Sequence, residues 1–295
     1  MPATKDVVIS IRNLRKSFAN PDGEQVIVLD NVTFDIYQGE TIVVMGGSGC
    51  GKSTLLNCLI GEHEVTSGEI LFKTKEMPQP RNIVGMREPE MNEIRKRFGI
   101  LFQSGALFNS MTLAENVALP LREHSAVDPS IIDIVVTLKL QQVHMLPHRD
   151  KLPAQLSGGQ KKRAGLARAT VLDPEILFYD EPSAGLDPVT SATIDDLITD
   201  LSKKLSVTSV VVTHEMDSAF RIADRLVMLE KGRVLKIGPR AEFEQLRDKA
   251  LDELADENEK LINQFLNGFT KGPLTDTDGT SQFEELLIRS EYSEI

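Results

Sequence analysis

The sequence predicts an α/β fold with a parallel sheet as its core, an antiparallel β layer before it and an inserted helical subdomain. Unbroken apolar runs of strand length, separated by helical stretches, lie at 41–45, 175–179 and 207–213. Such runs are typical of parallel strands buried on both faces. Over 7–14 and 26–37 apolar and polar residues alternate, which predicts antiparallel strands on either side of the turn-rich segment 20–23.

Helices are predicted between residues 110 and 169. Apolar residues there recur mostly every three or four positions, as helices require, at Leu113, Val117, Ile131, Ile134, Val135 and Leu138. We therefore expect one domain over 7–240, with its helical subdomain at about 104–168. A charged helix over 241–266 and a short last helix from Gln282 are expected in an acidic helical C-terminal extension, 241–295.

Composition excludes several classes of protein. The chain has 295 residues, 41% of them hydrophobic, which is enough for a sizeable core. Its apolar runs are far shorter than the roughly 20 residues that cross a bilayer, and the N-terminus lacks the pattern of a secretory signal. We expect a cytoplasmic protein whose two cysteines, Cys50 and Cys58, are reduced.

The net charge of −11 is concentrated near the C-terminus. Residues 241–295 hold 14 Asp and Glu against 5 Lys and Arg, which is −9 of that total. The rest of the chain offers no broad basic surface, so we expect no nucleic-acid partner. The basic run at 161–163 is expected to be a solvated helix face, and an acidic tail is ordinarily solvated as well, less often a docking element.

A phosphate-binding loop follows the first predicted parallel strand. It fits the pattern G-x-x-x-x-G-K-[ST] with Gly46, Gly47, Ser48, Gly49, Cys50, Gly51, Lys52 and Ser53, and Thr54 opens the next predicted helix, 54–60. In such a loop backbone N–H groups surround the β-phosphate, and the helix N-terminus adds its positive end. We expect Lys52 to reach the β- and γ-phosphates of ATP and Ser53 to bind Mg²⁺. The competing interpretation is a glycine-rich turn without a ligand.

The second half of this site follows another buried strand. The run 176–179 ends at Asp180 and Glu181, and the carboxyl end of a parallel strand lies at the same sheet edge as the P-loop. We expect Asp180 to hold Mg²⁺ through water. Glu181 is expected to orient or deprotonate the attacking water, because phosphoryl transfer depends on positioning and charge neutralisation. Alone, an acidic pair is ordinarily a loop start; its place after a P-loop favours catalysis.

A glycine-rich segment lies 20 residues before Asp180 and precedes a predicted helix, 161–169. Its residues are Leu156, Ser157, Gly158, Gly159 and Gln160. With a P-loop before it and an acidic strand end after it, the chain closely resembles the ABC ATPase family over about 7–238. The resemblance implies a P-loop (RecA-like) core and the activity of an ATP hydrolase with ATP and Mg²⁺.

Other site residues follow from the resemblance. Phe18 resembles the aromatic residue that stacks on adenine, Gln103 the glutamine that contacts Mg²⁺ and the attacking water, Asp187 the D-loop aspartate, and His214 the switch histidine. Each has a structural alternative when taken alone, as a core aromatic, a loop residue or a hydrogen-bonded histidine. The expected catalytic residues are Lys52, Gln103, Glu181 and His214, and the expected metal ligands are Ser53, Gln103 and Asp180.

The resemblance also implies partners. In this family Ser157 and Gly159 would contact the γ-phosphate bound by a second copy, so two ATP sites form at a two-fold interface. ATP closes the pair and hydrolysis opens it. A separate integral-membrane permease docks beside Gln103, which implies a peripheral position on the cytoplasmic face of the inner membrane.

Two segments resemble one branch of the family. Residues 100–108 and 111–124 closely resemble the ATPases of MCE-type lipid transporters, the Mla-like systems, and 264–268 with Gly272 and Pro273 resembles their C-terminal extension. The implied cargo is phospholipid moved between membranes, with an MCE-domain protein as partner and a small regulatory subunit as a candidate partner for the segment after Pro273. Gly47 departs from the proline common in the family, and we expect the loop to tolerate it.

Three alternatives stay open. An ABC importer or exporter of another small molecule would share every catalytic residue. A non-transport ABC protein acting on ribosomes or DNA would ordinarily carry two nucleotide-binding domains or a long coiled coil. A protein that senses ATP without hydrolysing it fits poorly with Glu181 and His214.

Overall fold

The computed structural model describes residues 6–274, apart from the side chain of Leu251, and the chain divides into two compact units, Met1–Ile237 and Gly238–Ile295. The predicted division at residue 240 lies close to this one and stays a prediction. The short helix predicted from Gln282 lies outside the described residues. Within them, no helix combines the length and the apolar character that crossing a bilayer demands.

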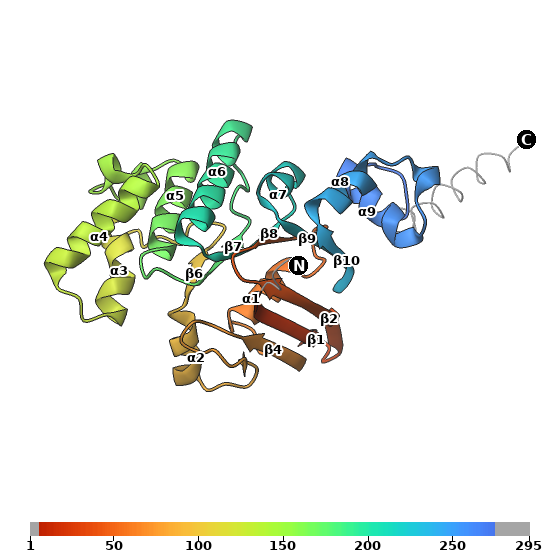
Figure 1. Cartoon of the computed structure of the whole chain (residues 1–295), viewed down its shortest axis with the longest axis horizontal. Coiled ribbons are helices and arrows are strands. Elements are labelled where there is room, and N and C mark those ends of the chain that lie inside the picture. The colour runs from red at the N-terminus through yellow and green to blue at the C-terminus, as the bar shows by residue number, and fades with distance from the viewer. Residues whose placement is uncertain (1–5, 275–295) are drawn as a thin grey trace, which may run out of the picture. The chain divides into compact units, whose positions relative to one another are not determined.

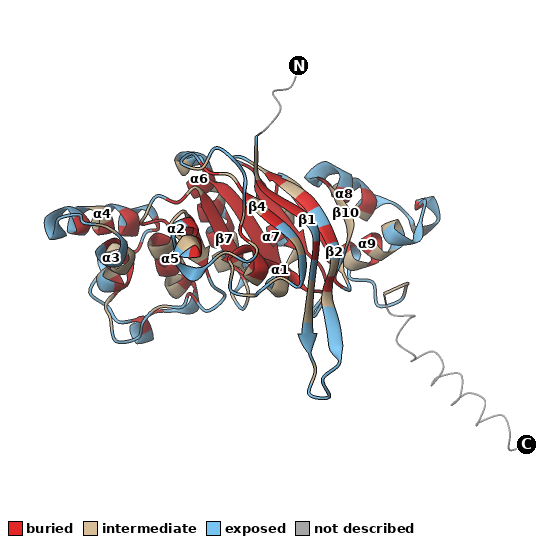
Figure 2. Cartoon of the chain, turned by 90° about the horizontal axis from the view of Figure 1, so that it is seen from below, coloured by how far each residue is buried: buried red, intermediate tan, exposed pale blue. Residues whose placement is uncertain are grey.

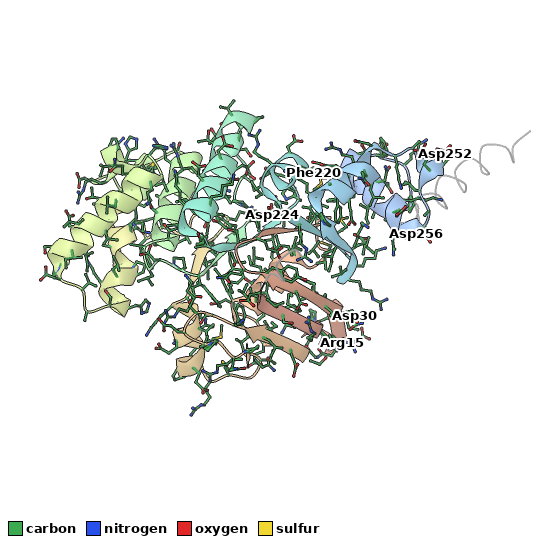
Figure 3. The ribbon with its side chains drawn as sticks, in the orientation of Figure 1. Arg15, Asp30, Phe220, Asp224, Asp252 and Asp256 are labelled. Carbon is green, nitrogen blue, oxygen red and sulfur yellow. The ribbon has the colours of Figure 1, made fainter. Side chains whose placement is uncertain are left out.

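The antiparallel layer is a four-stranded sheet in the order β2-β1-β4-β5 (Figure 1). Its strands are β1 (Val7–Ala19), β2 (Gln25–Tyr37), β4 (Ser67–Phe72) and β5 (Arg81–Asn82). Inward residues of β1 such as Ile9, Ile11 and Leu14 are fully buried, and the register shifts between Ile11 and Leu14, so the alternation is interrupted there. Arg15 on β1 and Asp30 on β2 form an ion pair at 3.9 Å, and Figure 3 shows them on neighbouring strands.

The core of the first unit is a six-stranded sheet in the order β10-β9-β3-β8-β7-β6. Its strands are β3 (Thr41–Met45), β6 (Phe98–Leu101), β7 (Ile176–Asp180), β8 (Thr208–Thr213), β9 (Arg225–Glu230) and β10 (Arg233–Pro239). The strands from β9 to β6 pair in parallel, and β3 and β8 are buried along their whole length. Figure 2 shows this sheet at β7, in the colour of buried residues. The prediction of a parallel core is confirmed, and the carboxyl ends of β3, β6, β7 and β8 meet at one edge.

Four helices belong to this sheet and its connections: α1 (Lys52–Leu59), α2 (Glu88–Arg95), α6 (Pro188–Leu205) and α7 (Met216–Ile222). Helix α1 contacts β8 and β7, α7 contacts β3, and α6 packs on α7. At the amino end of the sheet the carboxylate of Asp224, labelled in Figure 3, accepts a hydrogen bond of 2.8 Å from the backbone N–H of Thr41. This bond fixes the start of β3, the strand that leads into the P-loop.

The helical subdomain contains three helices that pack on one another (Figure 1). They are α3 (Leu113–His124), α4 (Pro129–Gln142) and α5 (Gly158–Ala169), with the short 3-10 helices η1 (Leu146–His148) and η2 (Pro153–Gln155) before α5. Helix α3 begins with a capping box in which Thr112 and Glu115 exchange hydrogen bonds. Helix α5 also packs against β6 and thereby joins the subdomain to the parallel sheet.

Helix α4 was predicted from the spacing of its apolar residues, but that spacing does not identify its packed face. Ile131, Ile134 and Leu138, which indicated the helix, are 50%, 59% and 53% exposed. Ile132, Val136 and Leu140 are buried instead. The helix is apolar on nearly every side, so the spacing of its apolar residues identifies a helix without selecting the face that packs.

Over 241–266, where one helix was expected, the described residues of the second unit form parts of two α-helices. These are α8 (Arg240–Asp248) and α9 (Glu257–Asn267), with the 3-10 turn η3 (Leu251–Glu253) between them. Asp256, labelled in Figure 3, caps α9 by accepting a 2.8 Å hydrogen bond from the backbone N–H of Glu259. The side chain of Asn263, fully buried, donates to the carbonyl groups of Leu246 at 2.7 Å and Lys249 at 3.0 Å. The break between α8 and α9 was not predicted, because the segment 249–256 contains neither glycine nor proline.

Candidate functional site

The P-loop joins the end of β3 to the start of α1, and two of its glycines are required by its shape. Gly46 has φ 156°, and a Cβ there would lie 2.2 Å from the carbonyl oxygen of Leu229. Gly51 has φ 108°, and a Cβ there would lie 2.8 Å from a methyl group of Leu29. Gly47 shows neither restriction, since a Cβ added there would have no atom within 4 Å. The loop therefore needs glycine at some of its positions because of steric contacts and backbone conformation.

Lys52 lies inside the loop that precedes it. Its side chain is buried, and its Nζ donates hydrogen bonds to the carbonyl oxygens of Gly46 at 2.8 Å and Gly47 at 2.9 Å. The ammonium group is thus held within the curve of the loop, where a phosphate would meet it. The thiol of Cys50 lies 3.9 Å from the same Nζ, and burial raises its pKa. Cys50 and Cys58 are both free thiols, as predicted.

Asp180, the last residue of β7, carries the feature expected of a metal ligand. Within the described part of the chain its Oδ1 is buried and has no hydrogen-bond partner. Burial raises the pKa of Asp180, and the neighbouring charge of Glu181 raises it further, while a hydrogen bond from the side chain of Ser53 opposes both. An unsatisfied buried carboxylate oxygen beside a serine hydroxyl is a donor set that fits Mg²⁺.

Glu181 and His214 form a contact across the ends of two neighbouring parallel strands. Glu181 follows β7, and His214 follows β8. His214 Nδ1 lies 3.0 Å from Glu181 Oε1, and the backbone N–H of His214 donates to Oε2 at 3.3 Å. The Glu181 side chain is 11% exposed, whereas that of His214 is 58% exposed. The carboxylate is therefore oriented by a histidine that solvent or a ligand can reach.

The backbone of Glu181 is unusual. Its φ of 47° lies in the left-handed region, which few residues other than glycine adopt. Its own N–H donates to the carbonyl oxygen of Val212 on β8 at 2.9 Å. Non-glycine residues in this conformation occur often at functional sites, where surrounding contacts hold them.

Lys162 contradicts the prediction that 161–163 is a solvated helix face. It is only 4% exposed, and its Nζ donates a 2.8 Å hydrogen bond to the carbonyl oxygen of Glu181. Burial lowers the pKa of Lys162, and the carboxylates of Glu215, Glu181 and Asp180 oppose that effect. The signal that sequence reasoning missed is positional, because Lys162 lies three residues after buried Gly159 and four before buried Leu166, on the packed face of α5.

Gln103 lies just beyond the carboxyl end of β6, where its side chain is exposed. The segment after it is fixed by Arg168 of α5, which donates to the carbonyl oxygens of Gly105 at 3.1 Å and Ala106 at 2.7 Å. Fully buried Asn116 of α3 fixes the next stretch, with Nδ2 donating to three carbonyl oxygens and Oδ1 accepting from the N–H of Phe108 at 2.8 Å. Both anchors were missed. Arg168 is 62 residues from Ala106 in sequence, whereas Asn116 is only eight residues from Phe108, and no motif marks it as an anchor.

The second glycine-rich segment forms the N-terminus of α5. Ser157 is the N-cap, and it exchanges hydrogen bonds with Gln160 in a capping box. Ser157 and Gly158 are exposed, whereas Gly159 is buried against α6, where an added Cβ would lie 2.4 Å from the methyl group of Thr190. An exposed helix N-terminus presents unpaired N–H groups and favours anions.

Asp187 and Asp195 both serve the structure of α6. Asp187 is its N-cap, accepting from the N–H of Thr190 at 3.0 Å, and the hydroxyl of Thr190 lowers the pKa of Asp187. Asp195, which sequence reasoning missed, is 2% exposed and accepts a 2.5 Å hydrogen bond from Ser218 of α7. The hydroxyl of Ser183, two residues after Glu181, donates in turn to that of Ser218 at 3.3 Å. Burial raises the pKa of Asp195 to about 6.

Phe18 lies near the end of β1 and is 37% exposed. The His63 ring packs against it in a T-shaped arrangement, with ring centres 5.3 Å apart. The ammonium group of Lys16 lies 4.4 Å from the centre of the Phe18 ring. Phe18 is therefore a partly open aromatic surface on the antiparallel sheet, whereas Lys52, Asp180, Glu181 and His214 gather at the edge of the parallel sheet.

Comparisons with known proteins agree with this geometry. Residues 29–184 match the protein family described as ABC transporter. Among solved structures, the ATP-binding cassette MJ0796, in a dimeric post-hydrolysis state bound to ADP and Pi, is similar with a TM-score of 0.71 and 30% identity, covering 79% of this chain and 98% of that one.

Two curated groups of relatives are similar over most of the chain. A probable ribonucleotide transport ATP-binding protein, mkl, of Mycobacterium leprae is 40% identical over 96% of this chain and 76% of its own. The intermembrane phospholipid transport system ATP-binding protein MlaF of Haemophilus influenzae is 35% identical over 90% of this chain and 93% of its own. MlaF of Escherichia coli K12 is also 35% identical, over 84% of this chain and 86% of its own.

Proposed function

The chain belongs to the ABC transporter family as an ATP-hydrolysing subunit, and we propose that the cargo whose transport it drives is phospholipid moved between membranes. The hydrolytic site is built from the P-loop, Asp180, Glu181 and His214. The observation that carries this assignment is the Glu181–His214 contact at 3.0 Å, beside a buried carboxylate oxygen of Asp180 that lacks a hydrogen-bond partner in the described structure.

In the proposed mechanism each residue has a distinct task. Phe18 stacks on adenine, and the N–H groups of residues 46–54 surround the phosphates. Lys52 exchanges its bonds to the loop carbonyl groups for bonds to the β- and γ-phosphates. Ser53, Asp180 and Gln103 would hold Mg²⁺, which neutralises phosphate charge when bound.

Glu181 acts on the water that attacks the γ-phosphate. Its carboxylate orients that water and accepts a proton from it, and His214 keeps the carboxylate in position through Nδ1. Because His214 is more than half exposed, its ring can also reach the γ-phosphate when the nucleotide is bound. Hydrolysis then removes the charge that both halves of the site recognise.

A second copy of the chain completes the site in this proposal. Ser157, Gly158, Gly159 and Gln160 form the helix N-terminus of α5, with Ser157 and Gly158 exposed, and this end favours the γ-phosphate bound by the other copy. Asp187 lies at the start of α6 beside this segment and belongs to the same surface. The similarity to MJ0796, solved as a dimer, supports the arrangement. An integral-membrane permease binds beside Gln103 and places the pair at the cytoplasmic face of the inner membrane.

The phospholipid cargo is supported by the similarity to MlaF, which extends over nearly the full length of both chains. An MCE-domain protein and a small regulatory subunit are the further partners proposed on that basis. A second candidate cargo is supported by the mkl relative, which is more similar at 40% identity and is described as a probable ribonucleotide transporter subunit. Both candidates share the same hydrolytic site.

The hydrolytic assignment is tested with Glu181→Gln. This variant should bind ATP with nearly parental affinity and lose at least about a hundredfold in turnover, and it should accumulate as an ATP-dependent dimer in light scattering. The matched control is Glu175→Gln, which changes a glutamate just before β7 that accepts from the N–H of Lys75. Turnover near the parental rate in Glu181→Gln would show that Glu181 is not the catalytic carboxylate.

The cargo is tested by gentle purification of the tagged chain from membranes of its host, with mass spectrometry of the proteins and lipids that accompany it. Recovery of a permease, an MCE-domain protein and enriched phospholipid supports the proposal. A different permease with a ribonucleotide-binding protein would exclude the lipid cargo and leave the ATPase assignment intact. Recovery of ribosomes or DNA would exclude transport.

A further inference from the structure

We propose that Lys162 is a positioning residue that ties the helix carrying the second glycine-rich segment, α5, to the catalytic carboxylate of the same chain. The inference rests on the proposed function, because it takes Glu181 as the group that activates water. Lys162 lies five residues after Ser157, the N-cap of α5, and is buried within the helix that Ser157 opens. It is therefore placed to connect two parts of the protein that serve different nucleotides in a dimer.

The connection is direct and buried. Lys162 Nζ donates to the carbonyl oxygen of Glu181 at 2.8 Å, and the lysine is 4% exposed. The N–H of Glu181 is held by Val212 of β8, at 2.9 Å. The Glu181 backbone is thus hydrogen-bonded to β8 through its N–H and to α5 through its carbonyl oxygen. Because φ of Glu181 is 47°, a conformation that surrounding contacts must hold, loss of either hydrogen bond allows the carboxylate to move.

The choice of a lysine is informative. A buried ammonium group is unfavourable unless its charge is compensated, and here Asp180, Glu181 and Glu215 supply that compensation. Yet the hydrogen bond of Lys162 goes to a backbone oxygen, so the group positions a peptide in addition to balancing charge. Lys139 on α4 is a useful contrast, since it is also buried, at 6% exposed, but pairs with the exposed carboxylate of Asp173 at 2.6 Å.

The arrangement has a consequence for the dimer. The N-terminus of α5 would contact the γ-phosphate bound by the second copy, while Lys162 on the same rigid helix holds Glu181 in the site of its own chain. A shift of α5 on nucleotide binding therefore moves the carbonyl oxygen of Glu181 with it. Arg168, further along α5, holds Gly105 and Ala106 in the segment after Gln103. Helix α5 thus links the two composite sites and the proposed permease-facing loop.

Steady-state ATPase kinetics of the full chain test this role with three variants. Lys162→Met keeps most of the side-chain length and removes the ammonium group, and we expect kcat to fall about tenfold to a hundredfold, the loss typical of one charged hydrogen bond, with KM for ATP within about threefold. Lys162→Arg should recover most of kcat, because it restores a charged donor. Lys139→Met, the matched loss of a buried lysine, should leave kcat and KM near parental values.

Two further measurements separate positioning from simple stability. In a Glu181→Gln background, Lys162→Met should still form the ATP-dependent dimer, because the nucleotide contacts are unchanged. If Lys162→Met does not fold, Lys162→Gln keeps an N–H donor without the charge and should give a kcat below those of the parent and of Lys162→Arg.

Three results would overturn the inference: a parental kcat in Lys162→Met, an equal loss of kcat in Lys139→Met, or a fall in ATP affinity that accounts for the whole effect. These outcomes differ from failure of the proposed function. That failure would appear as parental turnover in Glu181→Gln, whatever Lys162 does.

Discussion

The chain contains two glycine-rich loops that open helices, and they obtain their shape in different ways. In the P-loop, Gly46 and Gly51 adopt positive φ values and lie against Leu229 and Leu29, while Lys52 fills the inside of the curve. In the segment at 157–160, a capping box forms the helix start, and only Gly159 packs closely, against a methyl group of Thr190.

The difference distinguishes two kinds of binding element. The P-loop is shaped by contacts within one chain, whereas the segment at 157–160 is a partly exposed helix end that a second copy would use in the proposed dimer. The P-loop is tied to the parallel sheet through its neighbours and through the bonds of Lys52 to its carbonyl groups. The second segment lies at a helix end where Ser157 and Gly158 are exposed to solvent. Its shape is supported by the packing of α5 against α6. Substitutions in the two loops should therefore differ in their effects on ATP binding, stability and turnover.

The largest effect is expected for Gly46→Ala. The new Cβ would lie 2.2 Å from a backbone oxygen that cannot rotate away, at φ 156°, so the free energy of unfolding should fall by at least about 3 kcal/mol. ATP binding should be lost as well. Urea unfolding and calorimetric titration with ATP measure both quantities. Gly47→Ala, where nothing lies within 4 Å of the added Cβ, serves as control, and an equal loss there would show that the steric argument is wrong.

Next is the pH dependence set by Asp195, which supports the helices behind the second segment. Its pKa of about 6 lies above the ordinary 3.8, so the native state holds the proton more strongly than the unfolded state. The free energy of unfolding should consequently decrease by up to about 3 kcal/mol as pH rises from about 4 to about 6, and stay lower above that range.

Asp195→Asn should remove this part of the pH dependence. Urea unfolding between pH 4 and 7 measures it, with Asp196→Asn as control because the Asp196 side chain is 73% exposed. If the parent and Asp195→Asn showed parallel pH profiles, the raised pKa would have no bearing on stability.

A smaller effect is expected for Gly159→Ala. The added Cβ meets a side-chain methyl group, which yields more readily than a backbone atom, so a loss of about 2 kcal/mol is expected. ATPase turnover should fall while the ATP affinity of the single chain stays near parental. Adding Thr190→Ser removes the methyl group and keeps the hydroxyl that bonds Asp187, so it should restore stability. Failure of this rescue would contradict packing as the cause.

The smallest effect is expected for Asp187→Ala, which removes the N-cap of α6 and should cost about 1 kcal/mol. Asp187→Ser restores a capping oxygen, so its thermal unfolding should return close to that of the parent. ATPase assays of the two variants sharpen the comparison. Recovery of stability together with turnover would mean that Asp187 acts only as a cap, whereas stability without turnover supports its proposed place at the dimer surface.

Much of the fold was predictable because burial leaves a strong mark on sequence. The strands β3, β7 and β8 are buried over nearly their whole length, so unbroken apolar runs identified them within one residue of their ends. Apolar spacing also predicted the helix α4, but it does not indicate which face packs, because apolar residues occur on several sides of the helix. Sequence reasoning failed between α8 and α9, where the chain turns without a proline or glycine.

The site was predictable where motif residues are close in sequence and not where anchors are distant. Asp180 and Glu181 could be placed at the sheet edge because parallel strands end there together. The partner of Glu181 on α5 could not, since a lysine in a basic run is ordinarily solvated. Only the position of Lys162 on the packed side of the helix distinguishes it from Lys161 and Arg163. The roles of the individual site residues stay predictions for the variants above.

The hydrogen bonds of Asn263 have a practical meaning for where the chain can be cut. Helices of nine and eleven residues, as α8 and α9 are, have little stability alone, and Asn263 closes the open end of α8 by donating to Leu246 and Lys249. A shortened protein that stops between residues 249 and 256 would leave the carboxyl end of α8 without the side-chain donor of Asn263. The remaining helix would then be prone to proteolysis and to aggregation. A stop after residue 274 keeps this side-chain donor, and it also keeps the hydrogen bonds of Gln264 to Phe269 and Leu274.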